Sequence, residues 1–223
     1  MLSPEAYLKL VKGIYEANAN EETAEWQRKY LRFKFDFYGM KAPVWVGLMK
    51  PVFKENGLLS GEALKQFVRL CYNESFRELH YTGLQMIEKN LKNQSADFIY
   101  FLEELIETNS WWDTVDWIAK LVRLHFIRHP ELIVPVTEKW IESKDMWLQR
   151  VAIIFQLLLK DKTNEKLLYD YILRVKDSKE FFIQKAAGWA LRDYSKTNPD
   201  SVRKFITANT LAPLTVREGS KYI

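Results

Sequence analysis

The chain has 223 residues, of which 48% are hydrophobic and 28% are charged, a composition typical of a folded globular protein and not of a disordered one. Eight glycines and seven prolines are too few for the frequent turns of an all-β fold. The single cysteine, Cys71, excludes a disulfide framework and a cysteine-based zinc site, and the three histidines fit no metal-ligand spacing. No apolar run reaches the length of a membrane span, and the first twelve residues lack the order of a signal peptide. We therefore expect a cytoplasmic protein without a metal or other cofactor.

The charge is distributed unevenly along the chain. Residues 1–144 hold 19 basic and 20 acidic residues, whereas residues 145–223 hold 14 basic and 9 acidic residues. A basic C-terminal third suits an anionic partner such as nucleic acid. A solubilising surface would have the same composition, so charge alone leaves both interpretations open.

Helical periodicity dominates the whole sequence, and no segment alternates as a strand does. Capping residues or first-turn prolines mark helix starts at Ser3-Pro4, Ala42-Pro43, Ser110, Lys144-Asp145 and Asn198-Pro199. The tail from Thr210 is less regular. The predicted helices, in chain order, span residues 4–17, 22–37, 43–54, 60–71, 75–90, 95–107, 112–126, 131–142, 145–160, 163–174, 179–196 and 199–208.

An internal repeat aligns Phe76, Trp111, Met146 and Phe181 at steps of 35 residues. Each repeat is a helix of about four turns, a short turn and a shorter helix. Repeats of this kind are typical of an α-solenoid of the HEAT or armadillo type, in which stacked helix pairs share one core and curve around a groove. We predict an all-α solenoid of HEAT-like repeats, forming one domain over residues 1–223 with a concave basic groove.

The repeat places charged and aromatic residues on one side of the solenoid. If positions are numbered from Arg77, Trp112, Trp147 and Phe182 as zero, offsets 0, 3, 4 and 7 share one helix face. This composition is that of a groove for a charged polymer, with aromatic rings for sugars or bases. The residues on this face are Arg77, His80, Tyr81, Trp112, Asp116, Trp147, Arg150, Lys185, Trp189 and, one turn further, Arg192.

Two aspartates compete for a functional role at the start of one helix. Asp116 follows Trp112 by four residues, so both side chains project from the same helix face. The pair is either a carboxylate beside an aromatic wall or a first-turn acid that complements the helix dipole. Asp113 fits the second role better, because it follows Ser110 by three residues, the position of a capping-box partner.

Arg150 lies in an apolar stripe with Trp147 and Ile154 as helical neighbours. A guanidinium in such a stripe is costly unless it is paired or faces a ligand. An internal ion pair and a ligand contact remain equally open, and they can coexist because Asp116 belongs to the adjacent repeat.

A basic stripe interrupted by one tryptophan follows in the last repeat. Its spacing fits a track for the DNA backbone, but it also fits a solvated helix face with a cation over the indole ring. We expect the other tryptophans to lie in the core. The stripe consists of Lys185, Trp189, Arg192 and Lys196, and the expected core tryptophans are Trp26, Trp45, Trp117 and Trp140.

Two long motifs resemble the signature of the AlkD-type DNA alkylation repair glycosylases. They are Ser110–Ala119 (SWWDTVDWIA) and Phe181–Pro199 (FFIQKAAGWALRDYSKTNP). Further matches are Trp147–Arg150 before an apolar helix and Tyr30 ahead of Gly39–Pro43. The resemblance covers roughly residues 5–208 in matching order. It implies an all-helical HEAT-like solenoid, in agreement with the 35-residue repeat.

The resemblance also implies roles for single residues. The catalytic carboxylate of the family matches Asp116, and its two lesion-flanking tryptophans match Trp112 and Trp189. Its cleft arginine matches Arg150, and the tyrosine of an early helix matches Tyr30. The family grips the lesion from the backbone side without a base pocket. We assign Tyr30, Arg150, Lys185, Arg192 and Lys196 to DNA binding.

We therefore expect a monofunctional DNA glycosylase for positively charged N3- and N7-alkylpurines, namely 3-methyladenine and 7-methylguanine. It would hydrolyse the N-glycosyl bond in duplex DNA during base excision repair and act as a monomer without a cofactor. The alternative is a non-catalytic HEAT-like DNA-binding or scaffold protein. The presence of Trp112, Asp116 and Trp189 together argues against that alternative.

Overall fold

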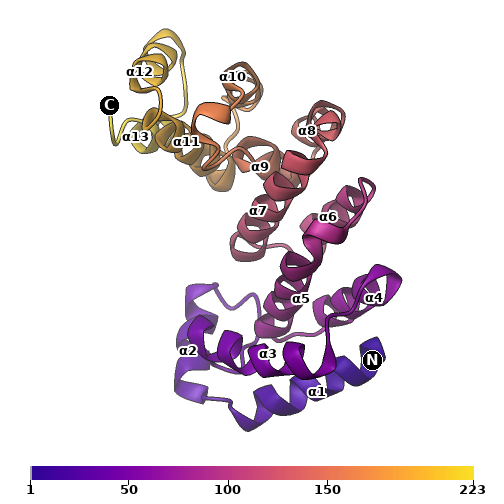
Figure 1. Cartoon of the computed structure of the whole chain (residues 1–223). Coiled ribbons are helices and arrows are strands. Elements are labelled where there is room, and N and C mark those ends of the chain that lie inside the picture. Colours follow the sequence, from indigo (N-terminus) through magenta and orange to yellow (C-terminus); the bar gives the residue numbers. More distant parts are fainter. Residues whose placement is uncertain (1) are drawn as a thin grey trace. The chain divides into compact units, whose positions relative to one another are not determined.

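The computed structural model describes residues 2–223 (Figure 1). Within these residues the chain forms thirteen α-helices and three short 3₁₀ turns, and an isolated bridge between Asp36 and Phe76 is the only β-type pairing. The prediction of an all-α fold is therefore confirmed. No helix in the described part of the chain is long and apolar enough to cross a membrane.

Contacts between helices divide the chain into two compact units, the first ending at Ser95 and the second beginning at Ala96. The prediction of one domain over residues 1–223 stays a prediction. The first unit holds α1 (Pro4–Ala17), α2 (Glu21–Tyr30), α3 (Ala42–Asn56), α4 (Gly61–Tyr72) and α5 (Arg77–Asn90), followed by the 3₁₀ turn Leu91–Asn93. The second unit holds α6 (Phe98–Glu107), α7 (Trp112–Arg128), the turn Pro130–Leu132, α8 (Ile133–Ile141), α9 (Met146–Ile154), the turn Lys160–Lys162, α10 (Glu165–Arg174), α11 (Phe181–Ser195), α12 (Pro199–Ala208) and α13 (Pro213–Gly219).

A buried glutamate organises the first unit. Glu78 of α5 accepts hydrogen bonds from the backbone N–H groups of Tyr38, Gly39 and Met40 at 2.9–3.1 Å, and thereby holds the segment between α2 and α3. Gly39 has φ of 91°, and a Cβ atom there would lie 1.9 Å from the carbonyl oxygen of Asn20. Only glycine fits this close approach.

Helix α2 ends at Tyr30, although periodicity predicts a helix to residue 37. The N–H of Phe33 donates to the carbonyl of Arg28 at 2.7 Å, and the N–H of Arg32 donates to that of Lys29 at 3.0 Å. These bonds close the helix end with both Arg32 and Phe33 at positive φ. No glycine or proline marks this helix end in the sequence. The helical periodicity therefore continues beyond Tyr30.

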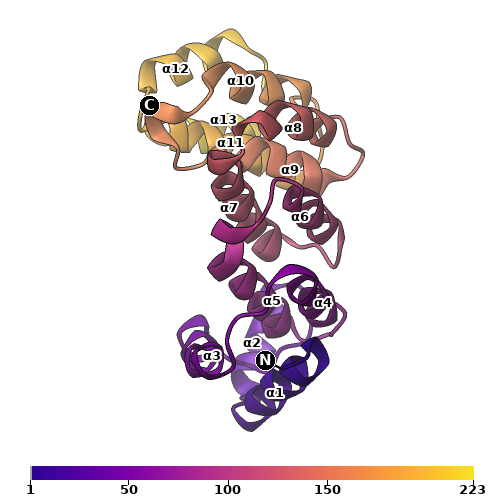
Figure 2. The ribbon, with the colours of Figure 1, turned by 45° about the vertical axis from the view of Figure 1, so that its right-hand side comes forward.

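The second unit confirms the helical repeat. Helices α7, α9 and α11 begin at Trp112, Met146 and Phe181, close to the 35-residue period. α7 packs on α9 and α9 packs on α11, while α8 and α10 pack against α9 and α12 packs against α11 (Figure 2).

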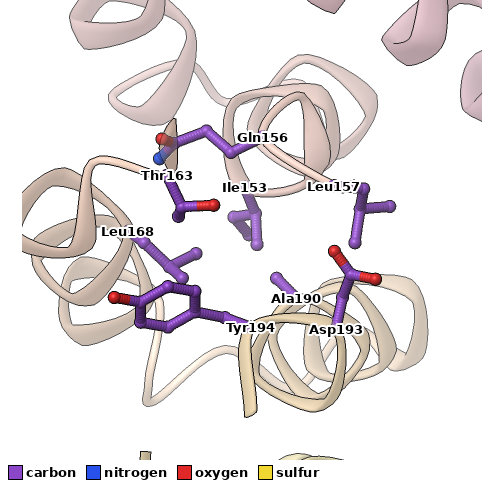
Figure 3. Close-up of a pocket in the computed structure, with 8 residues that line it drawn as sticks. All are labelled: Ile153, Gln156, Leu157, Thr163, Leu168, Ala190, Asp193 and Tyr194. Carbon is purple, nitrogen blue, oxygen red and sulfur yellow. The ribbon is translucent and has the colours of Figure 1, made fainter. Parts of the chain in front are cut away.

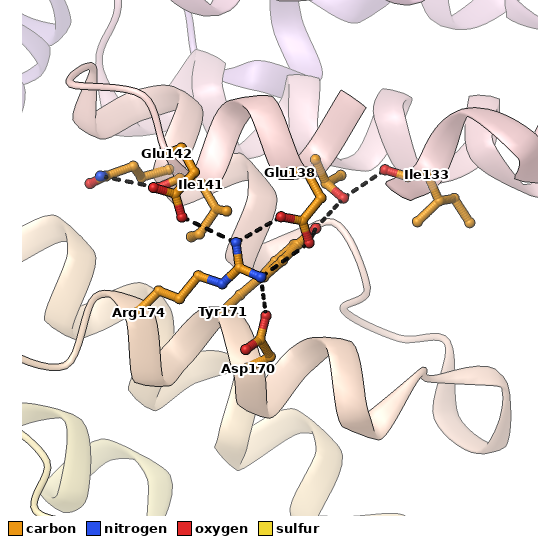
Figure 4. Close-up of polar contacts among 9 residues, drawn as sticks. Ile133, Glu138, Ile141, Glu142, Asp170, Tyr171 and Arg174 are labelled. Carbon is orange, nitrogen blue, oxygen red and sulfur yellow. Dashed lines mark hydrogen bonds and ion pairs between the residues drawn. The ribbon is translucent and has the colours of Figure 1, made fainter. Parts of the chain in front are cut away.

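Side-chain contacts within the second unit keep the spacing of the repeat. The Thr137 hydroxyl lies 2.7 Å from that of Tyr171, and Lys139 pairs with Glu103 at 2.6 Å. Figure 4 shows Arg174 of α10 between acidic side chains of α8 and α10. These partners are Glu138, Glu142 and Asp170, at 2.7, 3.1 and 2.7 Å.

Helix α9 ends at Ile154, six residues before the predicted end at residue 160. Asp193 of α11 accepts a hydrogen bond from the N–H of Leu158 at 2.7 Å, and Arg123 of α7 donates to the carbonyl of Leu157. Leu158 has φ of 66°. Figure 3 shows Asp193 beside Leu157 at a small pocket between α9, α10 and α11. Contacts from two neighbouring repeats thus end this helix early.

The C-terminal helix α13 was not predicted, because its seven residues are too few to show a period. It packs on α11 at Gly188, where an added Cβ would lie 2.5 Å from the Cβ of Glu218 and 3.0 Å from the carbonyl oxygen of Thr215. Glycine at this position allows the close approach of the two helices. The other predicted helix boundaries agree with the structure to within three residues.

The prediction that four tryptophans lie in the core is correct for Trp45 and Trp140, which are buried. Trp117 is half-buried. The prediction is wrong for Trp26, which is 61% exposed on α2. The reason is that α2 is a polar surface helix that buries Ala24 alone among its residues.

Candidate active site

The core of the candidate site is an ion pair between adjacent repeats. Nε of Arg150 on α9 donates to Oδ1 of Asp116 on α7 at 2.8 Å, and Nη2 donates to Oδ2 at 2.9 Å. This two-pronged geometry is the strong form of an arginine–carboxylate pair. The internal ion pair that the sequence analysis left open is therefore present. It joins two residues that the repeat alignment places on the same face of their helices.

Local structure holds Arg150 in this position. Asp145 caps α9 by accepting the N–H groups of Trp147 and Leu148 at 2.6 and 3.1 Å. Nη1 of Arg150 also donates to the carbonyl of Phe182 on α11 at 2.7 Å, an acceptor that no sequence signal reveals. Arg150 is only 5% exposed, and three of its five N–H donors serve Asp116 and Phe182. Its assignment to a DNA phosphate stays a prediction.

The carboxyl group of Asp116 has a raised pKa. Burial is the main cause, because it penalises the charged form, and the nearby Asp113 adds to it. The hydrogen bonds and charge of Arg150 lower the pKa and oppose this effect. Arg150 thus favours the charged form of Asp116 against the effect of burial.

Three aromatic rings from successive repeats pack together beside the ion pair. Trp111 lies 5.8 Å from Trp147 and 5.2 Å from Phe182, and Trp147 lies 5.0 Å from Phe182, measured between ring centres. The guanidinium carbon of Arg150 is 5.9 Å from the ring centre of Phe182. Trp147 is buried here. Trp147, which the repeat alignment places on the face of the site, therefore packs beneath the site.

A pocket of about 170 Å³ opens beside the ion pair. Asp116 of α7 and Trp189 of α11 both line it, as expected for residues that the repeat alignment places on one side of the solenoid. The sequence analysis assigned no role to its charged residues Lys120, Arg123 and Asp193. Lys120 and Arg123 lie outside both motifs, and Asp193 lies within the second motif without a matched function. The pocket is lined by Asp116, Ala119, Lys120, Arg123, Ile154, Leu157, Leu158, Trp189 and Asp193.

Trp112 is the first residue of α7, one turn before Asp116, and it is half-buried. The expected capping box at this end is wrong. The Ser110 hydroxyl donates to the carbonyl of Ile106 instead, and the cap residue of α7 is Trp111, which makes no side-chain capping bond. Asp113 is the acidic residue of the first turn, where it complements the helix dipole.

The basic stripe of α11 is tied to a residue that the sequence analysis missed. Glu218 of α13 is buried and pairs with Lys185 at 3.2 Å, Arg192 at 2.9 Å and Lys221 at 2.8 Å. Lys196 lies with its amino group 5.2 Å from the ring centre of Tyr222. The three cations around Glu218 keep between a quarter and a half of their side-chain surface exposed. Their role in DNA binding stays a prediction.

We expect Glu218→Gln to lower the free energy of unfolding by about 1–2 kcal/mol at neutral pH, because partly exposed cations lose a shared buried partner. Lys221, and then Lys185, lower the pKa of Glu218 from 4.5 to about 2. A lowered carboxyl pKa stabilises the fold above pH 4.5, and this contribution is lost as the pH falls toward 2. Urea unfolding of wild type and variant should therefore converge near pH 2.

Glu55→Gln is the matched control, since Glu55 is an exposed glutamate at the end of α3 and should leave stability unchanged. A stability difference for Glu218→Gln that persists undiminished at pH 2 would contradict the role of its charge.

Tyr30, the remaining predicted DNA-binding residue, lies at the end of α2 in the first unit and is 58% exposed. Its ring stacks on that of Trp26. Among residues 2–223 no group of three histidine, cysteine, aspartate or glutamate side chains is placed to hold a metal ion.

Fold and site together define a helical-repeat protein with a buried arginine–aspartate pair at a tryptophan-lined pocket. Residues 13–223 match the family described as DNA alkylation repair enzyme, and the chain belongs to this family. The resemblance found in the two motifs is thereby confirmed.

Two solved structures are similar to this chain. One is a predicted DNA alkylation repair enzyme from Enterococcus faecalis, 35% identical, with 92% of this chain and 96% of that chain covered and a TM-score of 0.86. The other is AlkD2 from Streptococcus mutans, 17% identical, with 88% and 98% covered and a TM-score of 0.65, which shows a shared fold. No protein with a curated description matches this chain.

Proposed function

We propose that this protein is a monofunctional DNA glycosylase that removes positively charged N3- and N7-alkylpurines, such as 3-methyladenine and 7-methylguanine, from duplex DNA. The observation that carries this proposal is the carboxylate of Asp116, held by Arg150 at the wall of a pocket that Trp189 shares. Membership of a DNA alkylation repair family supports DNA as the substrate.

The chemistry requires little machinery. Alkylation at N3 or N7 makes the base cationic, so it leaves as a neutral molecule and needs no protonation. Positive charge then develops on the sugar, as in glycoside hydrolysis. Asp116 opposes this charge and orients the attacking water, since each of its oxygens keeps an acceptor site beside the bond to Arg150.

Arg150 acts in this proposal through Asp116. Its two hydrogen bonds fix the orientation of the carboxylate, and its charge favours the ionised form against the effect of burial. Trp112 and Trp189 provide aromatic faces that favour a cationic sugar. Lys185, Arg192 and Lys196 contact phosphates of the DNA backbone. The enzyme acts as a monomer.

We expect the enzyme to select lesions by charge. With wild-type protein in excess over one duplex sequence, 7-methylguanine should be released and uracil should not, because a neutral base needs leaving-group protonation that this site does not offer. Chromatography of the released bases is the measurement. Trp112→Ala and Trp189→Ala should each slow release of 7-methylguanine, and the double variant should approach the spontaneous rate.

Tyr100→Ala is a suitable control for the tryptophan variants, because Tyr100 is an exposed aromatic residue on α6. Efficient excision of uracil would refute charge selection. Release of neither base by the wild type would favour the alternative of a non-catalytic DNA-binding protein.

A further inference from the structure

The C-terminal end of α2 and the segment that follows it expose aromatic and basic side chains together. Trp26, Tyr30 and Phe33 are 61%, 58% and 66% exposed. Large exposed apolar side chains that gather at one place mark interaction sites more often than solitary ones do. We call this surface the α2 face, defined by the exposed residues Trp26, Lys29, Tyr30, Arg32, Phe33 and Lys34.

Two rings of the α2 face already form a stacked platform. Trp26 and Tyr30 are one helical turn apart, and their rings are parallel to within 7° with centres 5.2 Å apart. Stacking on each other fixes the rings but leaves more than half of each side chain exposed. The platform is therefore ordered before any partner binds, which lowers the entropic cost of stacking a further ring on it.

The backbone beyond α2 holds Phe33 in a costly conformation. Arg32 and Phe33 have φ of 57° and 56°, a left-handed region that bulky residues rarely adopt. Glycine would remove this cost at either position. The 2.7 Å bond from the N–H of Phe33 to the carbonyl of Arg28 maintains the conformation, and the Phe33 ring stays in solvent. The helix end thus keeps the Phe33 ring exposed, where it is free of buried contacts and accessible to a partner.

The basic side chains of the α2 face favour an anionic partner. Arg28 lies within the helix end and is bound to Glu21 and Glu25, and Lys29 is paired with Glu25. In the segment beyond, the exposed cations Arg32 and Lys34 flank the exposed ring of Phe33. Aromatic platforms flanked by cations suit a single nucleic-acid strand, in which each base has a π-face and each linkage has a negative phosphate. A paired duplex offers no free base faces.

We propose that the α2 face binds unpaired nucleobases of DNA, with Trp26 and Phe33 stacking on bases and Lys29, Arg32 and Lys34 contacting the adjoining phosphates. DNA as the partner rests on the proposed function, but stacking is a property separate from base release. The two are therefore tested by different measurements.

The test measures binding of a labelled oligothymidylate of about 15 nucleotides and of a fully paired duplex of the same length, by fluorescence anisotropy. Trp26→Ala and Phe33→Ala should each weaken binding of the single strand about tenfold, and should leave duplex binding nearly unchanged. Trp26→Phe keeps a stacking ring and should restore most of the affinity. Tyr100→Ala, which removes an exposed aromatic residue from α6, should change neither affinity.

A second readout reports on Trp26 directly. Addition of the oligothymidylate should quench tryptophan emission in the wild type more than in Trp26→Phe, because a base stacked on an exposed indole quenches it. Urea unfolding of each variant should match the wild type, since Trp26 and Phe33 make little buried contact.

Unchanged single-strand affinity in Trp26→Ala and Phe33→Ala would overturn the inference and leave a protein partner or a second copy of the chain as the occupant of the face. Equal loss of affinity for single strand and duplex would overturn it as well, since it would show a general contact. If the wild type releases no alkylated base while its single-strand binding depends on Trp26, the proposed function fails and this inference stands.

Discussion

Asp116→Asn should slow the release of 7-methylguanine from duplex DNA by about 100-fold or more, because a neutral amide cannot oppose the positive charge that develops on the sugar. The variant keeps an oxygen that accepts a hydrogen bond from Arg150, so it should fold and bind DNA. Single-turnover release of the base, with DNA affinity measured in parallel, tests this expectation.

Asp113→Asn is the matched control on the same helix. Asp113 lies in the first turn of α7 and interacts favourably with the helix dipole, so its replacement should cost about 0.3–1 kcal/mol of stability and keep most of the activity. Should Asp113→Asn abolish base release while Asp116→Asn retains it, the assignment of the catalytic carboxylate is wrong.

Arg150→Met should lower the free energy of unfolding by about 3 kcal/mol at neutral pH, because it leaves the carboxylate of Asp116 and the carbonyl of Phe182 without their donor. Methionine fills a similar volume, so lost packing contributes little. Burial raises the pKa of Asp116, and the variant loses the opposing effect of Arg150. The cost should therefore shrink as the pH falls and Asp116 becomes protonated.

The same variant should alter the pH dependence of base release. Activity requires ionised Asp116, so it declines as the pH falls through a pKa that lies above the ordinary value for aspartate. Without Arg150 this decline should begin at a higher pH. Arg174→Met is the control, because its ion pairs lie at the surface and should cost about 1 kcal/mol or less with no change in the pH profile. Identical pH profiles for wild type and Arg150→Met would contradict the role of the pair.

Much of the candidate site can be predicted from the sequence, because residues one repeat apart in the chain lie next to each other in the fold. Asp116 and Arg150 are 34 residues apart, which is close to one repeat. They lie on equivalent faces of α7 and α9. A shared face in adjacent repeats predicts contact, and the structure has it. The starts of α1, α9 and α12 were likewise visible, since Ser3, Asp145 and Asn198 cap them with their own side chains.

The partners that complete the site were not accessible, because they are set by contacts between segments without a shared pattern. Glu218 meets Lys185 and Arg192 only because α13 folds back onto α11 at Gly188. The carbonyl oxygen of Phe182 accepts a hydrogen bond from Arg150. Every residue has such a carbonyl, so the residue type does not reveal this contact.

The sequence by itself determined the helical class, the repeat and the residues that share the face of the site, because the spacing of apolar side chains reports which side of each helix is buried. Only the tertiary structure decided where α2 and α9 end and that Trp26 lies in solvent. Neither helix ends at a glycine or proline. Asp193 and Arg123 from neighbouring helices bind the backbone beyond α9, and such bonds compete with helix continuation only after the repeats have packed.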